Sequence, residues 1–326
     1  MKKFTVLLIA ICLTWGAPVT VWGQSRRGVR IGYLDYVAQT NTALQHKVFI
    51  EELERLGWTK GRDLAIEWRS IDSDENRIPE LLSELFALDL RVLVTATTPI
   101  TLAAKKANTT TPIVFIYVSD PLGSKVVPSL SQPGGNVTGI SQMDTELCGK
   151  RVQLLTELIP NLKRLGVLIY PTASYVPAML SRTRQAAETV NLEVQLFEAK
   201  SPEGLDSAFE AMDREGVEAF VQIPYAMFWD QRKRIVNLAA RYRLPGIYEA
   251  TEFVHDGGLT SYAENFLAHE RRAAAYVDQI LRGKDPADLP VAQPMVFELA
   301  VNLSTANSLG LKIPESILTL AEHIVE

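Results

Sequence analysis

Two adjacent threonines and one glutamate have the types and positions that best suit the binding of a small charged molecule. Thr97 and Thr98 follow a predicted strand and precede Pro99, a pattern typical of the first turn of a helix. Their hydroxyls and the free amides of that helix start could bind a carboxylate, or the threonines could only cap the helix. Glu249 follows another predicted strand and could pair with an ammonium group, or it could be an exposed loop acid.

Other polar and aromatic residues stand at the ends of predicted strands. Ser119 and Asp120 precede Pro121, and Asp120 could cap the next helix or accept a ligand ammonium group. Tyr36 could stack on a ring. Tyr262 could lie in a binding cleft or brace a hinge. The remaining candidates for ligand contact are Tyr170, Ser174, Tyr175 and Tyr225. The many tyrosines favour a flat or aromatic ligand, although tyrosine also packs well at domain rims.

Motifs for chemical turnover are absent from the sequence. Gly32 is followed by Tyr33 and Leu34 rather than by a glycine-rich phosphate loop, and no nucleophile elbow or zinc-protease motif occurs. The four histidines fall in separate predicted elements, and two cysteines cannot build a cysteine-based zinc site. We therefore expect no catalytic residues, metal or cofactor. A serine triad that converges only in space is not excluded.

The composition is that of an ordinary soluble protein. The 326 residues include 33 basic and 38 acidic ones, for a net charge of -5, and this acidic balance argues against a nucleic-acid partner. The chain is 47% hydrophobic and 22% charged, which excludes disordered and low-complexity classes. Its length suggests two domains.

The first 23 residues have the pattern of an export signal. Lys2 and Lys3 precede an apolar stretch over 4–15, and Pro18 comes before small residues that predict cleavage after Gly23. The stretch is too short to span a bilayer. We expect the mature chain, 24–326, to be a soluble periplasmic protein.

Strand and helix patterns alternate in two successive series. Strands are predicted at 29–34, 64–68, 92–96 and 113–118, and again at 165–170, 193–197, 219–223 and 246–248, with helices between them. The predicted fold is α/β, with two similar lobes that each have a parallel sheet flanked by helices. A tight turn at 132–136 and a short extended segment at 137–141 lead from the first series to the second.

A third section, with a helix at 268–281, a strand at 294–302 and a helix at 304–309, belongs to neither series and is expected to cross back between the lobes. Lobe 1 would comprise 24–140 and about 261–293, and lobe 2 would comprise 141–260 and about 294–326. Ligands of open parallel sheets bind beyond the carboxyl ends of the strands. Two such sheets that face each other predict a ligand cleft between the lobes.

Several short blocks resemble a known family. The most specific are Pro133-Gly134-Gly135-Asn136-Val137-Thr138-Gly139 and Ser119-Asp120-Pro121, and further blocks lie at 57–62, 112–115, 297–303 and 306–310. In order, over about 28–326, the chain resembles the ABC transporter substrate-binding proteins of the type I periplasmic-binding fold. The resemblance implies two lobes joined by three crossovers, a hinge that closes on the ligand, and an ABC permease as partner.

Characterised members of that family bind aromatic amino acids such as tryptophan and phenylalanine. Tyr170 stands where many relatives carry Asn before Pro171, so the chain departs from the family pattern there. We predict a monomeric, non-enzymatic, exported solute-binding protein of an ABC importer that captures a small organic ligand, an amino acid above all. Two alternatives remain: a ligand sensor that presents its closed form to a membrane receptor kinase, and an exported enzyme on the same fold.

Overall fold

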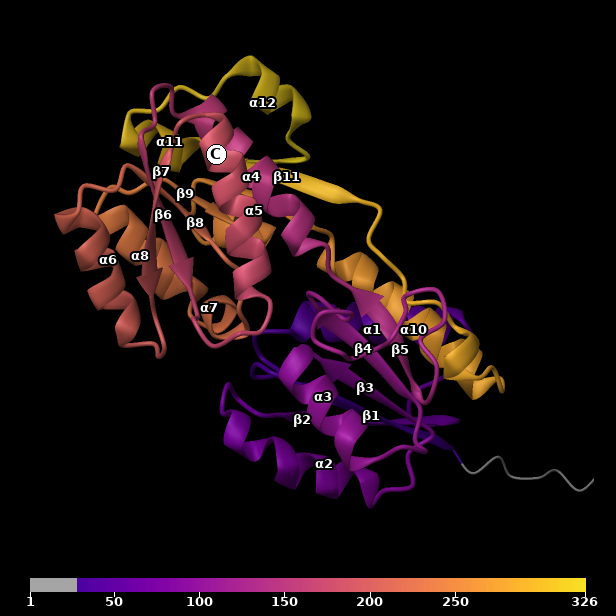
Figure 1. Cartoon of the computed structure of the whole chain (residues 1–326). Coiled ribbons are helices and arrows are strands. Elements are labelled where there is room, and N and C mark those ends of the chain that lie inside the picture. Colours follow the sequence, from indigo (N-terminus) through magenta and orange to yellow (C-terminus); the bar gives the residue numbers. More distant parts are fainter. Residues whose placement is uncertain (1–27) are drawn as a thin grey trace, which may run out of the picture.

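The computed structural model describes residues 28–326, and the predicted export signal lies outside this part of the chain. Two separate β-sheets, each covered by helices, form the two halves of the molecule (Figure 1). The α/β fold with two helix-flanked, mainly parallel sheets is confirmed. None of the helices within 28–326 is long and apolar enough to span a bilayer.

The first sheet has five parallel strands in the order β2-β1-β3-β4-β5. The strands are β1 (Val29–Asp35), β2 (Leu64–Ser70), β3 (Val92–Ala96), β4 (Ile113–Val118) and β5 (Val137–Ser141). Every residue of β3 and β5 is buried. Strands covered on both faces need no polar alternation, which explains why β3 is almost continuously apolar.

Helices cover both faces of this sheet. On one face lie α1 (Ala43–Arg55) and α10 (Phe266–Leu281), which share an apolar core with alternate residues of the strands. On the other face lie α2 (Ile78–Phe86) and α3 (Thr98–Ala107), and the short helix η1 (Glu75–Arg77) precedes α2. We call the sheet and these helices the five-stranded half. It also includes η2 (Pro286–Asp288), which contacts β5.

The second sheet has seven strands in the order β12-β11-β10-β9-β8-β6-β7. All neighbours are parallel except β10 and β11. The strands are β6 (Arg164–Ile169), β7 (Glu193–Glu198), β8 (Ala219–Gln222), β9 (Gly246–Tyr248), β10 (Thr260–Glu264), β11 (Phe297–Asn302) and β12 (His323–Val325).

Its helices also lie on both faces, and together they form the seven-stranded half. One core contains α4 (Asp144–Leu158), α5 (Val176–Thr189), α11 (Leu303–Leu309) and α12 (Glu315–Leu320). The other contains α6 (Gly204–Arg214), α7 (Ala226–Asp230), α8 (Arg232–Arg241) and α9 (Thr251–His255).

Helix α4 was not predicted from the sequence. Asp144 and Arg151 are buried on this helix and form an ion pair of 3.0 Å, so charged residues interrupt the apolar face that would have indicated it. Two helices, α7 and α8, lie between β8 and β9, and the predicted strand 294–302 begins at Phe297.

The chain passes between the halves three times, at 142–143, at Asn265 and at 293–296. These crossings lie close together: the Ser141 amide donates to the Ala292 carbonyl over 2.9 Å, and the Met143 amide donates to the Glu264 carboxylate. The predicted return to the first lobe, near 261, falls within β10, which pairs with β9, and the chain crosses one residue after β10 ends.

Candidate functional site

A cavity of about 100 Å³ lies between the two sheets, at the carboxyl ends of their strands. Its lining from the five-stranded half includes Asp35, Tyr36, Thr42, Gln45, Thr97, Thr98, Tyr117 and Ser119. The seven-stranded half contributes Tyr175, Pro224, Tyr225, Ala226, Trp229 and Glu249, while Gln142 comes from a crossing segment and Phe266 from the first residue of α10. The cavity therefore occupies the place where ligands of parallel sheets bind.

Most of the residues proposed from the sequence meet at this cavity: Tyr36, Thr97, Thr98, Ser119, Tyr175, Tyr225 and Glu249 line it. The other four do not. Asp120 accepts from the Gly123 amide over 2.7 Å and so shapes its own turn, and Ser174 is exposed. Tyr170 stacks on Tyr225 with ring centroids 3.9 Å apart. Tyr262 stacks on Phe297, and its carbonyl accepts from the Arg151 side chain.

The start of α3 presents hydroxyls and amides to the cavity. Thr97 is the residue before the helix and has a left-handed φ of 74°, a conformation that is strained for a β-branched residue. Neither Thr97 nor Thr98 caps the helix with its side chain, and both hydroxyl oxygens are buried without a partner among the described residues. Capping therefore does not occupy these hydroxyls, and an anion could use them together with the positive end of the helix.

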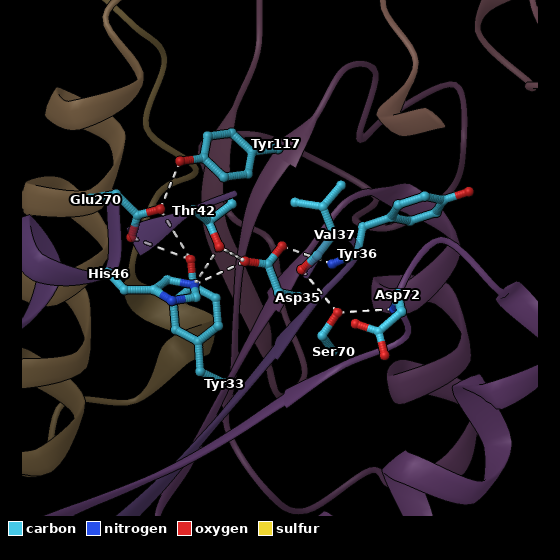
Figure 2. A network of polar contacts seen from close by, with 10 residues as sticks. All are labelled: Tyr33, Asp35, Tyr36, Val37, Thr42, His46, Ser70, Asp72, Tyr117 and Glu270. Atoms are coloured by element: carbon cyan, nitrogen blue, oxygen red, sulfur yellow. Dashed lines mark hydrogen bonds and ion pairs between the residues drawn. The ribbon is translucent and has the colours of Figure 1, made fainter. Parts of the chain in front are cut away.

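Asp35, at the end of β1, is a buried carboxylate whose oxygens are already satisfied. Its Oδ1 accepts from the Tyr36 amide over 2.7 Å, and its Oδ2 accepts from the Thr42 hydroxyl over 3.0 Å and from His46 Nε2 over 2.9 Å. Figure 2 shows the carboxylate between these donors. Asp35 thus joins the strand end to the start of α1, and it has little remaining capacity for a ligand.

Tyr117 reaches the cavity because β4 is irregular. The pairing of β4 with β5 shifts register between Phe115 and Val118, and Tyr117 has a φ of 57°. The Tyr117 hydroxyl donates to Glu270 of α10 over 2.6 Å, and the Tyr33 hydroxyl donates to the same carboxyl over 3.0 Å (Figure 2). Burial raises the pKa of Glu270 to about 8.

Glu249, which follows β9, is buried with far fewer partners than Asp35. Only 6% of its surface is exposed, and its Oε1 accepts from Gln222 Nε2 over 3.1 Å. Burial is the main cause that raises the pKa of Glu249 well above its ordinary value, and the nearby Asp144 carboxylate adds to it. Arg151 opposes this effect, but its guanidinium is bound to Asp144.

Hydrogen bonds join the two halves beside the cavity. The Tyr225 hydroxyl donates to Glu75 Oε1 over 2.9 Å, and the Tyr36 hydroxyl, 3.3 Å away, donates to the same oxygen. Asn41 Nδ2 donates to Asp230 Oδ1 over 2.8 Å. The halves are therefore held together across the cleft in this conformation.

The ionic character of the lining limits the ligands that it can hold. Asp35 and Glu249 are its acidic residues, and no lysine or arginine of residues 28–326 lines the cavity. An anionic group must therefore rely on amides and hydroxyls, whereas a cationic group meets a carboxyl. Within 28–326, no group of three or more His, Cys, Asp or Glu side chains could hold a metal ion.

Sequence reasoning missed several lining residues, each for a structural reason. Asp35 and Tyr117 lie within strands rather than after them, and Thr42 and Gln45 belong to the start of the following helix. Trp229 and Phe266 come from short or crossing elements that pack against each other, with ring centroids 5.5 Å apart.

Comparisons with known proteins agree with this architecture. The chain is 25% identical over 291 residues to a tyrosine-binding protein of Clostridioides difficile, covering 89% of this chain and 83% of that protein. An ABC domain of Streptococcus pneumoniae in complex with L-Trp is 25% identical, with a TM-score of 0.85 over 91% of this chain and 100% of that one.

A conserved domain protein of Vibrio cholerae is also 25% identical and superposes with a TM-score of 0.86 over the same shares of the two chains. The profile of the family described as ABC transporter substrate binding protein matches residues 31–325, almost the whole of the described chain. This protein therefore belongs to the ABC transporter substrate-binding protein family.

Proposed function

We propose that this chain is the exported solute-binding protein of an ABC importer and that it captures an aromatic amino acid between its two halves. The observation that carries the proposal is the division of charge in the cavity. An anion-binding helix start lies on one wall, and a carboxyl that has only one hydrogen-bond donor lies on the other. An amino acid carries the two complementary groups.

The α-carboxylate of the ligand would bind at the start of α3. The hydroxyls of Thr97 and Thr98 have no other partner among the described residues, and the free amides of the first helical turn point to the same place. The α-ammonium would bind Glu249 on the opposite wall. Because these contacts come from different halves, they would form together only when the halves are closed.

Aromatic side chains line the cavity from both halves, and they support an aromatic ligand. Tyr36 and Tyr117 come from the five-stranded half, and Tyr225 and Trp229 come from the other. Rings of this kind offer large apolar faces for offset or edge-to-face packing. The similarity to a tyrosine-binding protein and to a domain bound to L-Trp points in the same direction.

Capture would proceed by hinge closure. The two halves would move as lobes about the three crossing segments, and a ligand that contacts both walls would shift the population toward the closed form. The bonds from Tyr225 to Glu75 and from Asn41 to Asp230 would then be remade at each closure. The export signal at 1–23 would place the monomer in the periplasm, where its closed form would deliver the ligand to an ABC permease.

Titration of residues 24–326 with L-tryptophan, L-tyrosine and L-phenylalanine tests the proposal, with tryptamine and N-acetyl-tryptophan as matched analogues. Tryptamine lacks the carboxylate, and N-acetyl-tryptophan lacks the ammonium group. We expect an aromatic amino acid at 100 times its Kd to stabilise the native state by about 2.7 kcal/mol, with both analogues much weaker. A sugar or a purine that binds while every amino acid fails would contradict the proposal.

A further inference from the structure

We propose that Glu249 carries a proton in the empty cavity and releases it to solvent when the ammonium group of the ligand arrives, so that capture is coupled to the release of one proton. This inference rests on the proposed function, since it concerns the same cavity. It adds a property that neither the fold nor the family assigns: the ligand affinity of the protein would depend on pH through one named side chain.

The first support is the set of contacts around Glu249. The carboxyl accepts one hydrogen bond, from Gln222 Nε2, and the Oε1 of that glutamine is buried without a partner among the described residues. The nearest guanidinium, that of Arg151, is 1% exposed and is bound to Asp144 over 3.0 Å. Arg151 acts on Glu249 only through space, because no hydrogen bond or ion pair joins Glu249 to a cation of the described residues.

The second support is the count of charges on the elements packed around Glu249. Helix α4 contributes Asp144 and Arg151, and α9 contributes the half-buried Glu252, which also faces Arg232 and His255. Strand β8 contributes only the neutral Gln222, and Tyr175 stands at the start of α5. Asp144 and Glu249, the two fully buried carboxyls, thus share the guanidinium of Arg151, and a buried site with this imbalance favours a neutral carboxyl.

The direction of the titration follows from this environment. Burial and the Asp144 carboxylate raise the pKa of Glu249 well above its ordinary value, so the empty site is protonated at a pH where a free glutamate is not. An ammonium group beside it favours the carboxylate and lowers that pKa. Binding therefore releases a proton, and affinity rises with pH, by at most about tenfold per unit, up to the pKa of the empty site.

Asp35, the other carboxyl of the lining, does not fit this role. Three donors, namely the Tyr36 amide, Thr42 and His46, already surround its two oxygens. Both oxygens are therefore already engaged in hydrogen bonds, which leaves little capacity for a ligand ammonium group. The difference makes Glu249 the member of the pair that responds to a ligand.

Calorimetric titration with L-tryptophan or L-tyrosine in phosphate and in Tris, at the same pH near 7, measures the protons released. We expect the two buffers to give different heats that correspond to nearly one proton, with binding that weakens as pH falls. Glu249→Gln should bind more weakly and give equal heats in both buffers. Glu252→Gln, which alters a neighbouring half-buried carboxyl outside the lining, should keep the release. Equal heats for the unaltered protein would overturn the proposal and leave the proposed function intact.

A second measurement needs no ligand, so it tests the inference even if none of the amino acids binds. A carboxyl whose pKa is raised in the folded state destabilises that state as pH rises above the ordinary value. The unaltered protein should therefore lose unfolding free energy relative to Glu249→Gln between pH 5 and pH 7. A difference between the two proteins that does not change with pH would overturn the proposal, whereas failure of amino acids to bind would count against the proposed function alone.

Discussion

Each wall of the cavity buries a carboxyl, but the two walls surround it with different numbers of hydrogen-bond donors. On the five-stranded half, Asp35 is 5% exposed and is surrounded by three hydrogen-bond donors. On the seven-stranded half, Glu249 is 6% exposed and has one. Two acids of almost equal burial thus have unequal surroundings, and burial alone does not distinguish a structural carboxyl from one that is available to a ligand.

The comparison separates a carboxyl whose hydrogen bonds are complete without ligand from one whose hydrogen bonds are not. The network of Asp35, His46 and Thr42 fixes the start of α1 against β1, and Glu270 fixes Tyr117 (Figure 2). Around Glu249, by contrast, buried carboxyls outnumber the single guanidinium. We infer that the Asp35 network gives the five-stranded half its shape and that Glu249 is the carboxyl that a ligand ammonium group satisfies.

The largest expected effect comes from Glu249→Gln. The amide keeps the shape of the side chain but cannot become an anion, so the ligand ammonium loses its partner. We expect the affinity for the cognate amino acid to fall by about 100-fold, the scale of a lost buried charge pair. Unfolding of the empty protein should be unchanged or require more denaturant. Glu252→Gln is the matched control. Equal losses of affinity in the two variants would show that Glu249 is not the specific partner of the ligand ammonium group.

Asp35→Asn should lower the stability of the protein rather than mainly its ligand affinity. The amide cannot accept from all three donors, and its own N–H groups would face the Thr42 hydroxyl and His46. We expect a loss of about 2 kcal/mol of unfolding free energy, measured in urea, because a hydrogen-bonded charge is lost at a buried site. Asp213→Asn, at an exposed position of α6, should be neutral. A stable Asp35→Asn protein that fails to bind ligand would reverse the assigned roles.

Glu270 shows that the five-stranded half also has a pH response, but one that acts on stability. Its pKa is about 8 in the folded protein, above the ordinary 4.5, so the native state holds a proton that the unfolded chain releases. Stability should therefore fall as pH rises between these values, by up to about 1.4 kcal/mol per pH unit. Unfolding curves from pH 5 to 8 should show a smaller decline for Glu270→Gln than for the unaltered protein, and parallel declines would contradict the assignment.

Tyr225→Phe tests the bond that spans the cleft. The change removes the hydroxyl that donates to Glu75 of the other half and keeps the ring that stacks on Tyr170. We expect closure to be less favourable by about 1 kcal/mol, the net value of one hydrogen bond, and ligand affinity to fall about fivefold. The hydroxyl of Tyr175 donates to Pro224 within one half, so Tyr175→Phe is the control. If Tyr175→Phe lowered the affinity as much as Tyr225→Phe, the hydrogen bond across the cleft would make no specific contribution to ligand binding.

The sequence was sufficient to locate much of the cavity because parallel strands end at a common edge. Thr97, Ser119 and Glu249 each follow a predicted strand, and the fold brings them to one place. Tyr117 could not be found in this way, since a register shift inside β4 turns it toward the cavity. The excess of buried carboxyls around Glu249 could not be predicted either. Asp144 and Arg151 lie on α4, and this helix was not predicted because these charged residues interrupt its apolar face.

The sequence also could not predict which groups surround each of the two buried carboxyls. Asp35 and Glu249 are both single acids near strand ends, and nothing in their local sequence distinguishes them. The donors that satisfy Asp35 come from the next helix, whereas the groups around Glu249 come from α4, α9 and β8. Such surroundings depend on tertiary packing, so the sequence indicated Glu249 as a candidate but missed Asp35, and it could not distinguish their roles.

Thr98→Ala is the smallest change, and it tests the anion side of the cavity. The Thr98 hydroxyl has no partner among the described residues, so its removal costs the empty protein little, and only 5% of the residue is exposed. A ligand carboxylate would lose one hydrogen bond but keep the helix amides, so we expect a loss of affinity of about threefold to tenfold. Thr101→Ala is the contrasting variant: its hydroxyl bonds the Thr97 carbonyl over 2.7 Å, so it should lower stability instead. If Thr98→Ala lowered the unfolding midpoint as much as Thr101→Ala and left binding unchanged, the start of α3 would be a structural element alone, and the ligand carboxylate would have to bind elsewhere in a cavity that offers it no cation.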